Sequence, residues 1–216
     1  MTVRLDPAAD GPTNMRLDLE LLQLAEGGEL SGRVYSWRGP WVSLGKFQRP
    51  EVDLIGPIQY VIRPTGGKAV LHGHDSTIGL AAPLEILGCT ARDVKKAYRC
   101  ISKPIVEALR RCGLESALAE ETRFVGSGFK TADCFAFNSP NDIVDERTGK
   151  KVCGCALMLT QTAVLLQASI PNGKPVVDPA SVLREASDYI GPEWDASGLA
   201  GALEEALRYN NLHVRA

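Results

Sequence analysis

Arg63-Pro64-Thr65-Gly66-Gly67-Lys68-Ala69-Val70-Leu71-His72 is the stretch that decides the fold. Apolar residues precede it at 58–62 and continue within it at 69–71, and a proline, a threonine and two adjacent glycines separate the two runs. This order predicts a strand, a tight glycine turn and a second strand. Because glycine has no Cβ and tolerates positive φ, Gly66-Gly67 lets another molecule lie against the backbone.

Three cationic or protonatable side chains, Arg63, Lys68 and His72, frame this glycine turn. Such a turn suits a ligand that carries a carboxylate, a phosphate or an acyl carbonyl. Turn chemistry alone also allows a simpler interpretation, a β-hairpin with two solvated cations. A second stretch, residues 133–156, argues against that simpler interpretation.

The composition is that of a globular protein. The chain has 216 residues, of which 44% are hydrophobic and 23% charged, with a formal net charge of −2. This length predicts one domain over residues 1–216, with residues 1–12 as a loose leader that lacks the apolar core of a secretory signal. The charge predicts neither nucleic acid nor anionic lipid as a partner, and no apolar run approaches the ~20 residues of a membrane span. We therefore expect a cytoplasmic location.

Six cysteines are present, and their spacing predicts no metal site. Cys153-Gly154-Cys155 has one residue between its thiols, and no second pair completes a tetrahedral zinc set. The chain is also too large to resemble a small disulfide scaffold. We expect Cys89, Cys100 and Cys112 to be reduced packing residues in or near a helix.

The apolar periodicity predicts helices and strands in alternation. Thr13 or Asn14 would cap a helix that ends near residue 25, and Thr90 a second helix that ends near residue 112 and is kinked or divided by Pro104. Two more helices are expected over 180–189 and 199–209. The expected strands are 33–37, returning at 41–44, then 58–62, 69–71, 77–82, 116–119, 134–137, 143–145, 151–156, 164–170 and 212–214. This order predicts an α+β fold, with helices packed on a largely antiparallel sheet.

The second stretch contains the candidate chemistry. If Cys134 and Lys151 lie on neighbouring strands of one hairpin, the lysine ammonium can approach the thiol. An ammonium within about 4–6 Å favours thiolate over thiol, and a thiolate is a nucleophile for acyl transfer. Taken singly, Cys134 is better interpreted as a packing thiol and Lys151 as a solvated lysine in a turn.

Together these stretches resemble a known family. The run from Arg63 to His72, followed by Asn141-Asp142-Ile143-Val144 and by Lys151-Val152-Cys153-Gly154-Cys155-Ala156, is similar to the biotin/lipoate protein ligase and lipoyl (octanoyl) transferase superfamily. The resemblance covers roughly residues 12–172, where the early Asn14-Met15 with Asp18 is similar to the family's first helix. It implies the fold of the class II biotin/lipoate ligase catalytic domain.

Two chemistries occur in that superfamily, and this chain is more similar to the cysteine-dependent octanoyltransferases. Those often show a basic residue after Thr-Gly-Gly and a Cys-Phe pair before the lysine strand, as Lys68 and Cys134-Phe135 do here. The alternatives are an ATP-dependent lipoate ligase, which would need ATP and Mg²⁺, and a non-catalytic module that binds a lipoyl or biotinyl domain. The last is suggested by Cys155, Leu157 and Ala168, which replace the family's usual Ser, Gln and His.

The resemblance also implies roles for single residues. Cys134 would carry the acyl thioester, and Lys151 would lower the pKa of that thiol and orient the acyl carbonyl. The wall around the acyl group and the incoming lysine would consist of Arg63, Gly66, Gly67, Lys68 and His72, and the acyl chain would lie against Gly154, Cys155 and Ala156. No cofactor is implied for a transferase. The donor would be acyl carrier protein, and the acceptor a lipoyl domain of a 2-oxoacid dehydrogenase or the glycine cleavage H protein.

Overall fold

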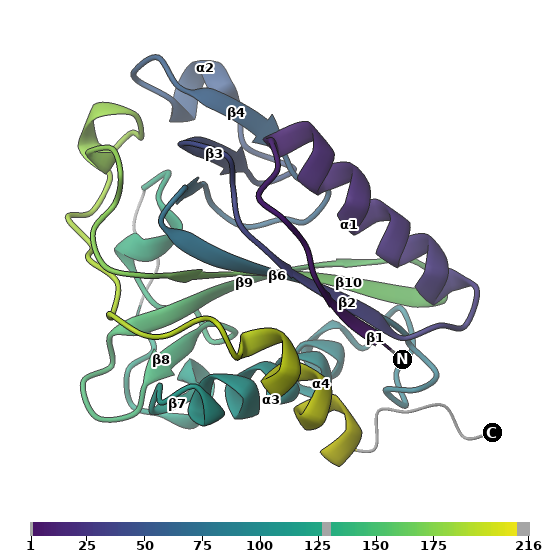
Figure 1. The fold of residues 1–216 in the computed structure, drawn as a ribbon. Helices are drawn as coiled ribbons and strands as arrows, with labels where there is room; N and C mark the ends of the chain where they lie inside the picture. Colours follow the sequence, from purple (N-terminus) through teal and green to yellow (C-terminus); the bar gives the residue numbers. More distant parts are fainter. Residues whose placement is uncertain (1, 127–130, 211–216) are drawn as a thin grey trace.

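The computed structural model describes residues 2–126 and 131–210, and a seven-stranded sheet forms its centre (Figure 1). Every neighbouring pair of strands in this sheet is antiparallel except β1 and β2. The predicted α+β class is confirmed. In spatial order the strands are β1 (Thr2–Leu5), β2 (Ser31–Tyr35), β6 (Asp75–Pro83), β10 (Ala163–Pro171), β9 (Lys151–Leu159), β8 (Ile143–Asp145) and β7 (Ser116–Leu118).

Helices cover both faces of this sheet. Helix α1 (Gly11–Glu26) lies on one side, and α3 (Val94–Arg111) and α4 (Leu199–Tyr209) lie on the other (Figure 1). The larger apolar core joins α3 and α4 to alternate residues of β10 such as Val164 and Leu166, whereas Leu165 between them packs toward α1. All nine residues of β10 are buried, which explains its nearly continuous apolar run.

A smaller sheet of three strands lies beside the short helix α2 (Pro50–Asp53) (Figure 1). Its order is β4 (Gln59–Ile62), β3 (Trp41–Leu44) and β5 (Val70–His72). The two strands around the glycine turn therefore pair with β3 and not with each other, so the hairpin interpretation was wrong. The expected return of 41–44 onto 33–37 was also wrong, because β2 belongs to the large sheet.

The amino-terminal prediction was wrong as well. Residues 2–5, expected to be loose, form β1, which pairs in parallel with β2 and buries Val3. Helix α1 begins at Gly11, before the expected caps, because the carboxylate of Asp10 accepts a hydrogen bond from the Thr13 amide at 2.9 Å. Pro12 stands in the first helical turn, where a missing N–H costs nothing.

Three other predicted elements differ. Residues 134–137 are not a strand: Cys134–Ala136 forms a 3₁₀ turn, which Asp133 begins by accepting a hydrogen bond from the Phe135 amide. The region 180–189 is not an α-helix: it contains the end of the 3₁₀ turn Pro179–Ser181 and a β-bridge from Leu183 to Leu54. Helix α3 begins at Val94, beyond the expected cap, and continues through Pro104 without dividing. The strand expected at 212–214 lies outside the described residues.

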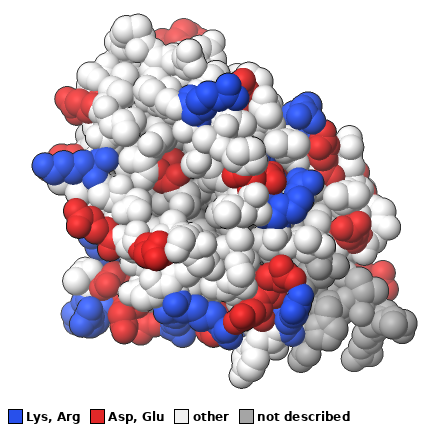
Figure 2. All heavy atoms as spheres, in the orientation of Figure 1, with Lys and Arg blue, Asp and Glu red and all other residues white. Residues whose placement is uncertain are grey.

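Charged side chains of both signs are interspersed on the face shown in Figure 2, most densely over α3 and α4. Over the described residues visible in that view, no broad basic surface suited to a nucleic acid backbone is seen. Among the helices of residues 2–126 and 131–210, none combines the length and apolarity needed to cross a membrane.

Candidate active site

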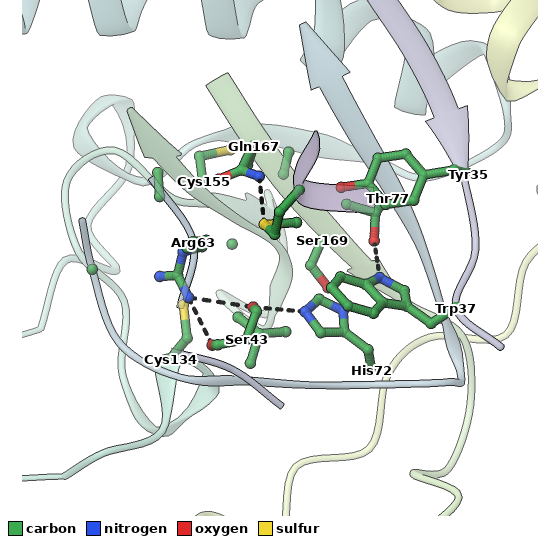
Figure 3. A pocket seen from close by; sticks show the side chains of 16 residues that line it. Tyr35, Trp37, Ser43, Arg63, His72, Thr77, Cys134, Cys155, Gln167 and Ser169 are labelled. Atoms are coloured by element: carbon green, nitrogen blue, oxygen red, sulfur yellow. Dashed lines mark hydrogen bonds between the residues drawn. The ribbon is translucent and has the colours of Figure 1, made fainter. Parts of the chain in front are cut away.

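A pocket lies where the two sheets meet. It encloses about 410 Å³, its open mouth included, and in Figure 3 Cys134 lies at one end with Trp37 and His72 at the other. The pocket combines apolar walls with a few polar groups, as small-molecule sites do. Its lining comes from α1, both sheets, the segment after β2, the glycine turn and the 3₁₀ turn at 134, namely Met15, Tyr35, Trp37, Ser43, Arg63, Gly67, Val70, His72, Thr77, Cys134, Gly154, Cys155, Ala156, Gln167, Ala168 and Ser169.

Cys134 and Lys151 meet as the sequence predicts. The Lys151 Nζ lies 3.6 Å from the Cys134 Sγ, although Cys134 reaches it from a turn and not from a neighbouring strand. The same Nζ lies 2.5 Å from the Cys134 carbonyl oxygen, 3.0 Å from the Phe137 carbonyl oxygen and 2.7 Å from the Asp142 carboxylate. The Lys151 ammonium therefore binds the carbonyl oxygens at both ends of the turn that carries the thiol, those of Cys134 and Phe137.

The expected low pKa of Cys134 is not what this environment produces. Desolvation raises the pKa of the Cys134 thiol, and the charges of Lys151 and Arg63 lower it by less than desolvation raises it. The Asp142 carboxylate acts in the same direction as desolvation. In contrast, burial lowers the pKa of Lys151, but the Cys134 sulfur when ionised and the Asp142 carboxylate outweigh it, so that this pKa is raised. The resting pair is a neutral thiol beside an ammonium.

Arg63 holds the glycine turn in shape. Its guanidinium is buried and donates to the carbonyl oxygens of Ser43 at 2.8 Å and of Gly66 and Lys68 at 2.7 Å each. Gly67 adopts a φ of +86°, which a side chain would strain. The turn is thus a fixed wall of the pocket. Arg63 lines this wall, but backbone oxygens already occupy much of its hydrogen-bonding capacity.

His72 anchors the far end of the pocket. Its ring stacks on Trp37 with centroids 3.9 Å apart, and its nitrogens lie 2.7 Å from the Ser43 Oγ and 2.7 Å from the Asp75 Oδ2. Burial alone would raise the pKa of Asp75, but His72 and the hydroxyl of Ser169 outweigh it and lower that pKa to about 2. His72 therefore has a fixed orientation against the pocket.

The remaining predicted residues divide into two groups. Gly154, Cys155 and Ala156 line the pocket from β9, as expected. Gly66 and Lys68 do not line it: the Lys68 Nζ lies 4.3 Å from the ring centroid of Phe137, beside the turn that carries Cys134. Cys155 also contacts its neighbour on the same strand, with the Cys153 and Cys155 sulfurs 3.7 Å apart. Within residues 2–126 and 131–210, no group of three or more metal-binding side chains gathers.

Sequence reasoning missed a network of polar residues that begins in the pocket wall, at Gln167 and Tyr35, and continues behind it. Gln167 accepts a hydrogen bond from the Thr65 hydroxyl at 2.7 Å and donates to Asp18 at 2.6 Å. Asp18 in turn contacts the buried Arg33 at 2.8 Å and accepts from Tyr35 at 2.8 Å. A glutamine within an otherwise apolar strand was the available signal for this network, because buried amides need partners. Asp142 belonged to a quoted motif, but no spacing rule linked it to Lys151.

Comparison with known proteins identifies the family. The profile of the Lipoyl protein ligase A/B catalytic domain matches residues 10–173. The chain belongs to this family. The Octanoyltransferase LipM of Anoxybacillus flavithermus is 34% identical over 169 residues, which cover 73% of this chain and 60% of that protein. The LipM of Kyrpidia tusciae is 33% identical over 188 residues, which cover 82% and 68%. The match to the first of these relatives thus spans about three fifths of its length.

Solved structures of family members confirm the fold. A putative lipoate protein ligase from T. acidophilum with bound lipoic acid has a TM-score of 0.68 at 22% identity, covering 97% of this chain and 86% of that one. A lipoate-protein ligase A bound with ATP has a TM-score of 0.72 at 20% identity, covering 97% and 84%. The lipoate ligase catalytic fold expected from the resemblance is therefore present.

Proposed function

We propose that this chain is an acyltransferase that moves an octanoyl (or lipoyl) group onto a lysine of a lipoyl domain through a thioester on Cys134. The observation that carries this proposal is the placement of Cys134: its thiol lines a pocket with apolar walls, and the Lys151 ammonium lies 3.6 Å from the sulfur. The curated relatives named octanoyltransferases, at 33–34% identity, support the same reaction class.

In the first half-reaction the Cys134 sulfur attacks the acyl carbon of a donor thioester, which we propose to be octanoyl-acyl carrier protein. A carbon–sulfur bond to Cys134 forms, and the bond to the donor sulfur breaks. The proton of the Cys134 thiol passes to the departing donor sulfur, so charge is conserved. A thiol whose pKa is raised reacts through a small thiolate fraction, and the nearby ammonium of Lys151 is the group that stabilises that fraction.

In the second half-reaction the neutral amine of the acceptor lysine attacks the thioester. An amide bond forms, the bond to Cys134 breaks, and the Cys134 sulfur takes the amine proton. The raised pKa of Cys134 makes its sulfur a poorer leaving group, and the Lys151 ammonium 3.6 Å away offsets part of this effect by stabilising the departing thiolate. The acceptor that we propose is a lipoyl domain of a 2-oxoacid dehydrogenase or the glycine cleavage H protein. The cytoplasmic location of the protein stays a prediction.

The test is intact-mass measurement of the protein after incubation with octanoyl-acyl carrier protein. We expect an added octanoyl mass that hydroxylamine removes, that is absent in Cys134→Ala and that transfers to a lipoyl domain. Cys112→Ala is the matched control, because Cys112 lies at the end of α3 away from the pocket and should leave the adduct unchanged. The absence of an adduct on the wild-type protein would defeat the proposal.

No cofactor is required by this mechanism, and we propose that neither ATP nor Mg²⁺ takes part. An ATP-dependent ligase would instead release pyrophosphate when given lipoate and ATP, and it would tolerate Cys134→Ala. A non-catalytic module that binds a lipoyl domain would show neither activity. The same preparation should therefore be assayed with both sets of substrates, so that one experiment separates the three functions.

A further inference from the structure

We propose that Asp142 is a positioning residue for this reaction: its carboxylate keeps the Lys151 ammonium charged and seated on the turn that carries Cys134. This inference rests on the proposed function, because it assumes that the Cys134 thiol reacts. The contacts that support it, however, involve no substrate. Asp142 is 2% exposed, and one of its oxygens lies 2.7 Å from the Lys151 Nζ. Nothing in the resemblance to the family predicts a role for this carboxylate.

The contacts of Lys151 show why a carboxylate is needed there. Lys151 is 4% exposed, and a buried ammonium without a negative partner loses its proton or leaves the interior. Besides Asp142, its oxygen partners are the neutral carbonyls of Cys134 and Phe137. An ammonium has three N–H donors, which these three oxygens share with the Cys134 sulfur. Lys151 therefore acts on the Cys134 sulfur through its charge and a shared N–H, and as an ammonium it has no lone pair to accept a proton.

Asp142 is itself held in place from its own loop. The same carboxylate oxygen that faces Lys151 accepts hydrogen bonds from the Ser139 amide at 2.6 Å and from the Ser139 hydroxyl at 2.8 Å. Ser139 follows Phe137 closely in the chain, so the carboxylate closes the loop between the turn of Cys134 and β8. The ion pair between Asp142 and Lys151 therefore joins this loop to the start of β9.

The other charged groups near the thiol are Arg63 and Asp133, with Lys68 on the glycine turn. For Cys134, the effect of Lys151 on the pKa is larger than that of Asp142, and the two have opposite signs. Two outcomes can therefore be told apart when the carboxylate is removed. If Lys151 loses its charge or its ammonium moves away from the sulfur, the Cys134 thiol becomes less acidic. If Lys151 stays charged in place, the thiol becomes more acidic.

The test is the pH profile of Cys134 alkylation by iodoacetamide, followed by peptide mass so that Cys134 is read separately from the other cysteines. We expect Asp142→Asn to raise the midpoint by roughly one pH unit, which makes alkylation about tenfold slower below the midpoint. Asp142→Glu keeps a carboxylate and should restore most of the rate. Glu146→Gln is the matched control, because it removes an exposed carboxylate on the following turn. An unchanged or faster rate in Asp142→Asn overturns the proposal.

A second pair of variants keeps the proposal testable if Asp142→Asn does not fold. Lys151→Met and the double variant Lys151→Met/Asp142→Asn both lack the ammonium, and the double variant also lacks the unpaired buried carboxylate. If Asp142 acts through Lys151, its loss must not slow alkylation in this background. Slower alkylation in the double variant than in Lys151→Met overturns the proposal.

Acylation separates this inference from the proposed function. When wild-type protein forms the octanoyl adduct, Asp142→Asn should form it more slowly. When wild-type protein forms no adduct at all, the proposed function fails, whereas the alkylation profiles still decide whether Asp142 positions Lys151.

Discussion

Thr65 and Gln167 stand 102 residues apart in the chain, yet the Thr65 hydroxyl donates a 2.7 Å hydrogen bond to the Gln167 side-chain oxygen. Both residues are buried. This bond joins the glycine turn to the central strand β10, and the nitrogen of the same amide donates to Asp18 on α1 at 2.6 Å. These two hydrogen bonds therefore connect the wall of the pocket to the core of the protein.

Gln167→Leu should lower the free energy of unfolding by about 1–3 kcal/mol, because the buried Thr65 hydroxyl loses the acceptor of its proton and the buried Asp18 carboxylate loses one of its donors. For a protein of this size that is a fall of about 2–4 °C in melting temperature for each kcal/mol. Calorimetry of Gln167→Leu, Thr65→Val and the double variant measures it. Simple additivity of the two changes would contradict a direct contact.

Arg33 and Asp18 form a buried ion pair behind the pocket, with both side chains fully buried and 2.8 Å between the Arg33 Nη1 and the Asp18 Oδ1. Desolvation raises the pKa of Asp18, and Arg33 opposes this effect. We expect Arg33→Leu to cost about 3–5 kcal/mol in urea unfolding, because it leaves a buried carboxylate without a cation. Arg33→Leu with Asp18→Leu should recover part of that loss. A cost below 1 kcal/mol for Arg33→Leu (about the value of an exposed pair) would contradict the assignment.

Asp75 makes stability depend on acid pH. Its folded-state pKa of about 2 lies below the ordinary value of 3.8, so its ionised form contributes stability above pH 3.8 that is lost as the pH falls toward 2. The contribution is about 2 kcal/mol at neutral pH, since one pKa unit corresponds to about 1.4 kcal/mol. Urea unfolding across this range should show a shallower loss for Asp75→Asn than for wild type. Glu26→Gln, exposed at the end of α1, is the control and should follow the wild-type curve.

The elements with local signals were predictable from the sequence. The strands β9 and β10 were predicted to within a few residues, and the Thr-Gly-Gly turn correctly placed a bend at Gly67, whose φ is positive. Strand partners were not predictable in the same way. A glycine turn between two strands fits a hairpin as well as it fits two strands that both pair with β3, because turn chemistry does not specify which backbone lies alongside.

The site was predictable only in part, for a related reason. A hairpin of neighbouring strands was expected to bring Cys134 to Lys151, and the resemblance supported the same pair. The structure brings them together differently, since Asp133 turns the backbone at Cys134 away from an extended conformation. Desolvation, which reverses the expected pKa shift of Cys134, depends on packing from distant segments. The pairing of Asp142 with Lys151 spans a loop whose closure no periodicity indicates.

Gly154 is the residue against which the Cys134 sulfur rests. A Cβ added to Gly154 would lie 3.0 Å from the Cys134 Sγ and 3.6 Å from the Phe135 ring, whereas the φ of Gly154 is not in the positive range and permits a side chain. We expect Gly154→Ala to change stability by less than about 1 kcal/mol and to slow alkylation of Cys134 by roughly tenfold, because the methyl group displaces the sulfur from Lys151. Gly201→Ala in α4, where an added Cβ contacts nothing within 4 Å, is the matched control. Equal alkylation rates in the two variants would show that Gly154 does not set the position of the thiol.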